Sequence, residues 1–240
     1  MNKTTLGPLT QLIFMPRLFP LNCYLIEDEQ GITLIDACMP FLAKGIHEAI
    51  KATGKPLTRI LLTHVHGDHI GAVPYLKEKY PSAQIGISSR DAAILNGDHS
   101  LLPHEAQTPI KGDLPKKAPF APDFLIEDND QIGSIIAVAS PGHTPGHFAY
   151  LEQISNTLIA GDAFQSKGGF AVSGTLKWAF PFPAMATWHA PTAIASAKKL
   201  MSLKPSALVV GHGPALLQPV NMMKHAIDEA EQRIIRRSNR

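Results

Sequence analysis

The sequence has little of what would tie a protein to a membrane, to nucleic acid or to an oxidising compartment. It has no run of about 18 apolar residues, the length that crosses a bilayer, and its first 20 residues are interrupted by three prolines, so neither a spanning helix nor a signal peptide is expected. The formal net charge of +2 is too small to indicate a nucleic-acid or membrane partner. Cysteine occurs only at Cys23 and Cys38, which favours reduced thiols and a cytoplasmic location.

Metal-binding side chains are concentrated in one short segment. Residues 63–71 read THVHGDHIG and contain His64, His66, Asp68 and His69, directly after the apolar run 60–62. Imidazole and carboxylate groups are the usual ligands of zinc and its neighbouring metals. A turn at the end of a strand can aim neighbouring side chains at one point, so the segment predicts the start of a metal site.

Three later segments repeat this pattern of an apolar run, a glycine and then a histidine or aspartate. They end in SPGH at His143, in IAGD at Asp162 and in VGHG around His212. Side chains displayed at the ends of neighbouring strands have this appearance in a sequence. We therefore expect His143, Asp162 and His212 to complete the metal site.

Together these motifs resemble the metallo-β-lactamase-fold hydrolases, over nearly the whole chain from residues 34–36 to 211–213. The resemblance implies two divalent metal ions, zinc first, with manganese or iron as alternatives. It implies one site at His64, His66 and His143, another at Asp68, His69 and His212, a bridge at Asp162, and Asp36 behind the ligands. The pattern is similar to the glyoxalase II and lactonase branch rather than to the true β-lactamases, which lack this bridging aspartate.

The chemistry implied is hydrolysis of a small ester, lactone or thioester by a metal-bridging hydroxide. Asp68 and Asp162 are the candidate catalytic carboxylates, and Asp162 is also a candidate for moving a proton toward the leaving group. Asp36 would orient a ligand imidazole through its second nitrogen. His147 has two open interpretations, support of the ligands or structural packing. A phosphodiesterase of the same fold and a non-catalytic metal-binding protein are the alternatives, and the partner is a small molecule for a monomer or homodimer.

The expected architecture is α+β, a four-layer αβ/βα sandwich, because strand-like and helix-like segments occur in both halves. Residues 1–240 are expected to form one domain, since a boundary anywhere between residues 64 and 212 would split the metal site. Five prolines indicate an irregular insertion at about 97–131. A helix is expected at 192–203, with Thr192 as its N-cap.

A second long loop at about 164–191 follows the proposed bridging aspartate and is rich in aromatic side chains. Because ligand clefts are commonly lined by apolar and aromatic groups, these residues are candidates for the substrate pocket, with simple core packing as the alternative. The candidates are Phe170, Trp178, Phe180, Phe182, Trp188 and His189. Lys167 and Lys177 in the same loop are either exposed lysines or partners for a substrate carboxylate.

Overall fold

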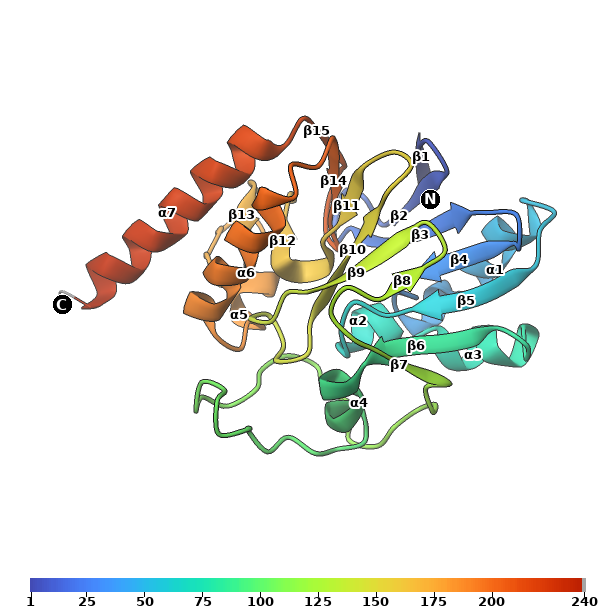
Figure 1. The fold of residues 1–240 in the computed structure, drawn as a ribbon, viewed down its shortest axis with the longest axis horizontal. Helices are drawn as coiled ribbons and strands as arrows, with labels where there is room; N and C mark the ends of the chain where they lie inside the picture. The colour runs from blue at the N-terminus through green and yellow to red at the C-terminus, as the bar shows by residue number, and fades with distance from the viewer. Residues whose placement is uncertain (239–240) are drawn as a thin grey trace.

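A computed structural model of the chain describes residues 1–238. Two β-sheets face each other and helices cover their outer surfaces, as Figure 1 shows. This arrangement confirms the expected αβ/βα sandwich. Among residues 1–238, none of the helices combines the length and the apolar character that spanning a bilayer requires.

The first sheet has seven strands in sequence order. They are β1 (Asn2–Leu6), β2 (Leu9–Phe14), β3 (Leu21–Glu27), β4 (Ile32–Ile35), β5 (Leu57–Leu61), β6 (Gln84–Ser88) and β7 (Phe124–Ile126). Strands β1 to β4 pair antiparallel, whereas β4 to β7 pair parallel. Parallel strands require crossovers, and α1 (Ala43–Lys51) and α3 (Val73–Lys79) supply two of them.

The second sheet follows the order β15-β14-β11-β10-β9-β8. Its strands are β8 (Gln131–Ile132), β9 (Ile135–Ala139), β10 (Phe148–Glu152), β11 (Thr157–Ile159), β14 (Ala207–Val209) and β15 (Leu216–Leu217). Helices α6 (Ala190–Ser202) and α7 (Val220–Ser238) pack against each other and cover its outer face. A separate pair, β12 (Phe164–Gln165) and β13 (Ala171–Val172), lies inside the expected aromatic loop.

Short helices mark the segments that carry the site. They are α2 (Gly67–Ile70), α4 (Ser89–Leu95), α5 (Phe182–Met185) and the 3-10 turns η1 (Pro40–Leu42) and η2 (Gly161–Ala163). Residues 98–123 of the expected insertion contain neither helix nor strand, and the edge strand β7 lies inside its expected bounds of about 97–131.

One expected helix boundary is wrong. Helix α6 begins at Ala190, and its N-cap is His189 rather than Thr192. Pro191 in the first turn explains the earlier start, because a proline is best tolerated where its missing N–H has no helical partner. The ring of His189 accepts a hydrogen bond from the backbone N–H of Thr192.

The two sheets share a core that includes two fully buried tyrosines. The Tyr150 hydroxyl donates to the carbonyl of Leu62 at 2.7 Å, and the Tyr24 hydroxyl donates to Val210 at 2.5 Å. Each bond crosses between the sheets and holds the backbone just before a candidate metal ligand. The shared core supports our proposal that the chain forms one domain. Both cysteines are buried free thiols, as the sequence predicts.

Candidate metal centre

The His-x-His-x-Asp-His segment follows the carboxyl end of β5, an interior strand of the first sheet, and leads into α2. Asp36, at the end of β4, fixes the start of this turn by accepting bonds from Thr63 N and Thr63 Oγ1, each at 2.8 Å. Asp36 is fully buried and has a positive φ of 58°, a conformation that is uncommon for residues other than glycine. The turn is therefore anchored to the neighbouring parallel strand.

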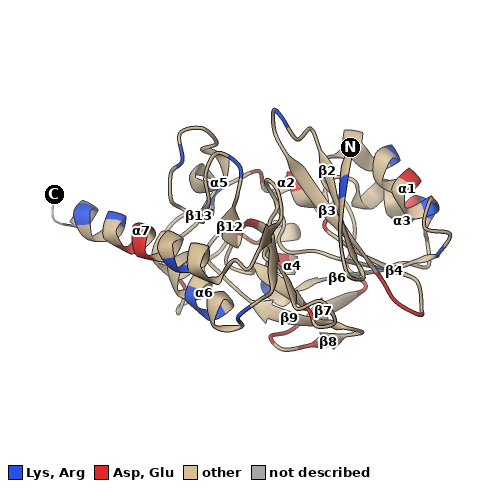
Figure 2. Ribbon diagram, turned by 90° about the horizontal axis from the view of Figure 1, so that it is seen from above, with Lys and Arg blue, Asp and Glu red and all other residues tan. Residues whose placement is uncertain are grey.

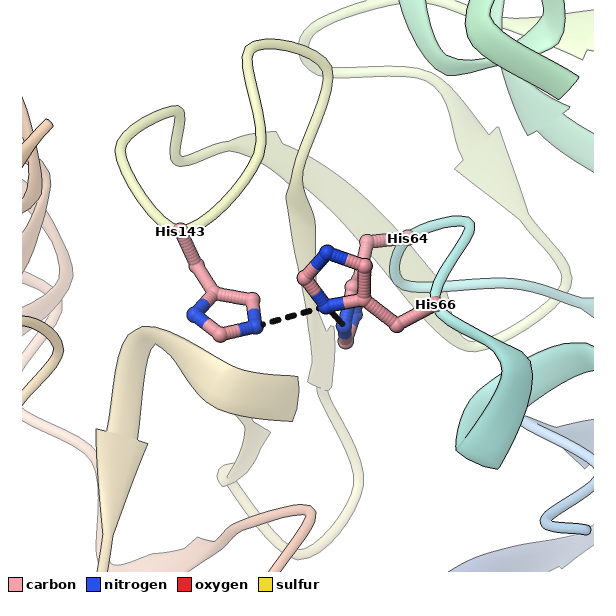
Figure 3. A group of neighbouring side chains, drawn as sticks. All are labelled: His64, His66 and His143. Carbon is pink, nitrogen blue, oxygen red and sulfur yellow. Dashed lines mark hydrogen bonds between the residues drawn. The ribbon is translucent and has the colours of Figure 1, made fainter. Parts of the chain in front are cut away.

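Three histidines converge on one point. The ring nitrogens His64 Nε2 and His66 Nδ1 are 3.1 Å apart, and His143 Nε2 lies 3.0 Å from the same His66 nitrogen. Figure 3 shows the three rings pointing toward one another from two separate loops. These are the residues expected at the first metal site.

A second group lies beside the first. Its members Asp68, His69 and His212 have candidate ligand atoms within 4.8 Å of one another. Asp162 lies between the two groups, because its Oδ2 is 3.4 Å from His143 Nε2 and 3.3 Å from His212 Nε2, while its Oδ1 is 3.4 Å from His69 Nε2. The structure thus brings all seven side chains expected as ligands together.

The partners of the outward nitrogens determine where the ring protons lie. Three of these nitrogens face a group that can only accept a hydrogen bond. The pairs, each 2.8 Å apart, are His66 Nε2 with Lys111 O, His69 Nδ1 with Asp36 Oδ2, and His212 Nδ1 with Pro20 O. A neutral imidazole carries a single N–H, so each ring donates outward and turns a lone pair inward.

The other two rings face hydroxyl groups that accept in the same way. Thr63 Oγ1 already donates to Asp36, which leaves its lone pairs for His64 Nδ1 at 3.0 Å. Ser173 Oγ lies 3.0 Å from His143 Nδ1. When each ring carries a single proton, all five histidines aim an unprotonated nitrogen at the shared space, which is how imidazoles bind metal ions.

Two further observations indicate that these residues fit a pair of divalent cations. His69 Nε2 and Asp162 Oδ1 are buried and face each other at 3.4 Å without a hydrogen bond, an arrangement that a cation bound to both would relieve. Gly211 closes one side of this space, because a Cβ there would lie 2.7 Å from His69 Cε1 and closer still to Asp162 Oδ1. Imidazole with carboxylate ligands suits zinc, iron or manganese, with no thiolate in the group.

Burial lowers the pKa values of His64, His66 and His143, so these three rings are neutral at pH 7. A neutral ring is the form that binds a metal ion. No proton has to leave these three histidines before a cation can enter their site.

The second group has the opposite electrostatics. Burial alone would lower the pKa of His212, but the carboxylates of Asp162 and Asp68 raise it to about 10. Burial alone would raise the pKa of Asp162, but His212 and His69 hold this pKa well below its usual range. The buried carboxylates of Asp68 and Asp162 therefore stabilise positive charge at this position.

Two supporting contacts had no signal in the sequence. Asp91, fully buried on α4, accepts bonds from Val65 N at 3.1 Å, Thr144 Oγ1 at 2.9 Å and Gly146 N at 2.8 Å. It therefore joins the turn of His64 and His66 to the turn of His143. In the sequence it resembles an ordinary acidic residue in the first turn of a helix.

The second contact comes from the insertion. Its residues 111–113 lie on the metal-binding turn, where Lys111 O meets His66 and Asp113 O accepts from Gly67 N at 3.0 Å. Gly112 packs flat on the His66 ring, with a φ of +99°, and a Cβ there would lie 2.5 Å from His66 Cε1. Backbone carbonyls and a packed glycine carry no side-chain signature that a sequence could reveal.

His147 contacts the backbone of a candidate ligand. Its Nδ1 lies 2.9 Å from Ser140 Oγ, and its Nε2 accepts from the backbone N–H of Asp162 at 3.2 Å. Burial lowers its pKa to about 3, which keeps the ring neutral and Nε2 available as an acceptor. Of its two open interpretations, these bonds favour support of the ligands.

A cleft of about 450 Å³ opens over the candidate ligands. Of the six aromatic-loop residues expected there, Phe182 lines it, and Phe180 lies just behind, 5.2 Å from the Phe182 ring and 5.4 Å from His212 between ring centroids. The other four lie elsewhere. Phe170 stacks on Phe164, Trp178 is 87% exposed, Trp188 donates to Thr108 O, and His189 caps α6.

A His and Asp cluster at one edge of an αβ/βα sandwich is typical of metal-dependent hydrolases. A sequence model of the metallo-beta-lactamase superfamily matches residues 16–212, and the chain belongs to this superfamily. It is 52% identical over 222 residues to the uncharacterized protein YobT of Bacillus subtilis (strain 168), covering 92% of this chain and 95% of that one. It is 32% identical to the probable metallo-hydrolase YflN of the same strain, covering 80% of each.

Two further similarities bear on chemistry. The hydroxyacylglutathione hydrolase GloC of Haemophilus influenzae (strain ATCC 51907 / DSM 11121 / KW20 / Rd) is 30% identical over 62% of this chain and 69% of its own. The crystal structure of TTHA1623 in a di-iron-bound form matches with a TM-score of 0.61 and 26% identity, covering 92% of this chain and 97% of that one.

Proposed function

We propose that the protein is a binuclear metal-dependent hydrolase that cleaves a small ester, lactone or thioester. The observation that carries the proposal is the convergence of five imidazole nitrogens and of the Asp162 carboxylate on one buried space. Without a bound cation, buried donors and acceptors in this space would have no hydrogen-bond partner, which is unfavourable.

His64, His66 and His143 would hold one cation, Asp68, His69 and His212 the other, with Asp162 between them. When bound, a pair of divalent cations lowers the pKa of water toward neutrality and polarises the bond under attack, with zinc the first candidate and iron or manganese the alternatives. The protein then needs no nucleophilic side chain of its own.

The two carboxylates have different access to a substrate. The Asp162 side chain is 4% exposed, and its carboxylate oxygens lie within 3.4 Å of His69, His143 and His212, which suits a metal ligand. The Asp68 side chain is 24% exposed and lines the cleft. We assign Asp162 to holding both cations and Asp68 to holding one cation while facing the reacting bond.

Two features favour an acyl bond over a phosphodiester. The relative named hydroxyacylglutathione hydrolase acts, by its name, on an acyl compound. Figure 2 shows Lys and Arg spread over helices at both ends of the molecule and over several loops rather than gathered in one patch. The cleft is lined mainly by apolar side chains outside the candidate ligands. A cleft of this kind suits an acyl group better than a polyanion.

The test is turnover of the metal-loaded protein on matched esters, lactones, thioesters and phosphodiesters. Asp162→Asn should lower kcat on the acyl compounds by at least about 100-fold, because it removes one charge and one ligand oxygen from the space between the cations. Asp228→Asn, on the exposed side of α7, is the matched control and should leave kcat unchanged. Full turnover by folded Asp162→Asn, or hydrolysis of phosphodiesters alone, would contradict the proposal.

A further inference from the structure

Three separate segments build apolar walls around the cleft. The turn after β2 supplies Met15 and Phe19, the segment after β4 supplies Met39 and Phe41, and α5 supplies further apolar residues that include Met185. Phe41 and Met185 are 64% and 68% exposed, so the apolar surface continues outward to the rim. Large apolar side chains gathered at an exposed rim indicate contact with an apolar ligand.

The wall nearest the metal site consists of aromatic rings packed against one another. The Phe19 ring lies 5.0 Å from the Phe180 ring, 5.0 Å from the Phe182 ring and 5.3 Å from His212, between ring centroids. This cluster packs an apolar wall directly against a candidate ligand. An acyl group bound at the metals would therefore extend along aromatic and aliphatic surface.

The described residues that line the cleft include a single charged side chain outside the metal site, and it is acidic. Among residues 1–238, the lining includes no lysine or arginine, and Asp113 is its one charged member besides the candidate ligands. The metal ions would attract an anion at the reacting bond only. A carboxylate carried farther out on a substrate would meet apolar walls or the like charge of Asp113.

The lysines of the neighbouring loop have other partners. Lys177 Nζ bonds both carboxylate oxygens of Glu229 at 2.8 and 2.9 Å. Lys167 Nζ donates to the carbonyl of Arg17 at 2.9 Å and lies 3.4 Å from that of Pro16. Neither lysine lines the cleft, so neither is placed to receive a substrate carboxylate.

We propose that this cleft selects substrates with an uncharged leaving group and an apolar acyl chain, and that it discriminates against thioesters of carboxylate-bearing thiols such as glutathione. This inference rests on the proposed hydrolase function and narrows it. Asp113 and Met185 are the residues that set the selectivity, through repulsion of anions and through contact with the chain.

The experiment compares two thioester series that share the same scissile bond. S-acyl-2-mercaptoethanol and S-acylglutathione differ in the charge and in the size of the thiol, and each is made with acyl chains of increasing length. The Asp113→Lys variant separates the effect of charge from the effect of size. In the uncharged series kcat/KM should rise about fourfold per methylene until the cleft is filled. At equal chain length the glutathione series should be slower by roughly tenfold.

Two variants assign the effects to residues. Met185→Ser should flatten the dependence on chain length, whereas Met222→Ser, a partly exposed methionine on α7 outside the cleft, should leave it unchanged. Asp113→Lys should bring the two series together, and Glu127→Lys, an exposed charge reversal elsewhere, should not. Faster glutathione thioesters, or a gap between the series that Asp113→Lys leaves intact, would overturn the inference.

A binding measurement separates this inference from the hydrolase function. Calorimetry of the metal-loaded protein with n-alkanols from butanol to octanol should show affinity rising about fourfold per methylene. The same rise with no thioester, ester or lactone turnover would refute the hydrolase function and support the apolar cleft. Affinity that does not change with chain length would overturn the inference whatever the turnover.

Discussion

Gly211→Ala tests the second metal group with the smallest possible change, one methyl group. Gly211 does not adopt the left-handed conformation, so the substitution strains no backbone angle. Its Cβ would lie 2.7 Å from His69 Cε1, where the closest normal approach is 3.0 Å, and it would press harder on Asp162 Oδ1. The imidazole must retreat by about 0.3 Å, more than the roughly 0.2 Å that metal-ligand distances tolerate.

We expect Gly211→Ala to fold and to lose affinity for one metal ion by on the order of 100-fold. Metal content after dialysis against a weak chelator, by elemental analysis, should fall from about two ions per chain to about one. Gly54→Ala is the control, since its φ of +71° is strained but nothing lies within 4 Å of the new methyl group. It should cost about 1 kcal/mol of stability and no metal. Two tightly held ions in Gly211→Ala would refute the proposed ligand geometry.

Three further predictions follow from individual contacts. Gly112→Ala should lower metal affinity and kcat together by about 10-fold or more, because the insertion can no longer lie on the His66 ring, and metal titration with steady-state kinetics checks both. Burial raises the pKa of Asp91 to about 6, above roughly 3.9 in an unfolded chain, so it contributes stability at low pH that is lost as the pH rises through 6. In urea titrations of metal-free protein, the stability of the wild type relative to Asp91→Asn should therefore fall by about 1 kcal/mol from about pH 5 to about pH 7.5, and an unchanged relative stability would contradict the shift. Trp178→Ser should change KM less than about twofold, because the side chain is 87% exposed and outside the cleft, and a large rise in KM would place Trp178 in the substrate path.

The ligand turns could be found in the sequence because each is a local pattern. An apolar strand, a glycine and a polar side chain follow one another within a few residues, as at Gly161-Asp162 and Gly211-His212. The same local logic placed Asp36 at the end of β4, where its Oδ2 meets His69 Nδ1. The fold class also followed, because strand and helix patterns recur in both halves of the chain.

The supporting residues could not be found this way, since their roles arise from contacts between distant segments. Asp91 is 26 residues from Val65 and 53 from Thr144, and only the folded chain brings these groups together. The cleft walls come partly from α5, inside the expected aromatic loop, and partly from the turn near Phe19 and the segment after β4, which the sequence did not indicate. The aromatic residues of that loop mostly pack elsewhere, because Trp188 and Phe170 fill the space between the loop and its neighbours.

The metal content of the purified and reconstituted protein tests the central claim most directly. Elemental analysis of the wild type beside His66→Ala and the surface control Asp228→Asn would measure how many ions the seven side chains hold. The account predicts about two divalent ions per chain in the wild type and control, and about one or fewer in His66→Ala. A wild-type protein that retains no metal after reconstitution, or a His66→Ala protein that retains both ions, would contradict it.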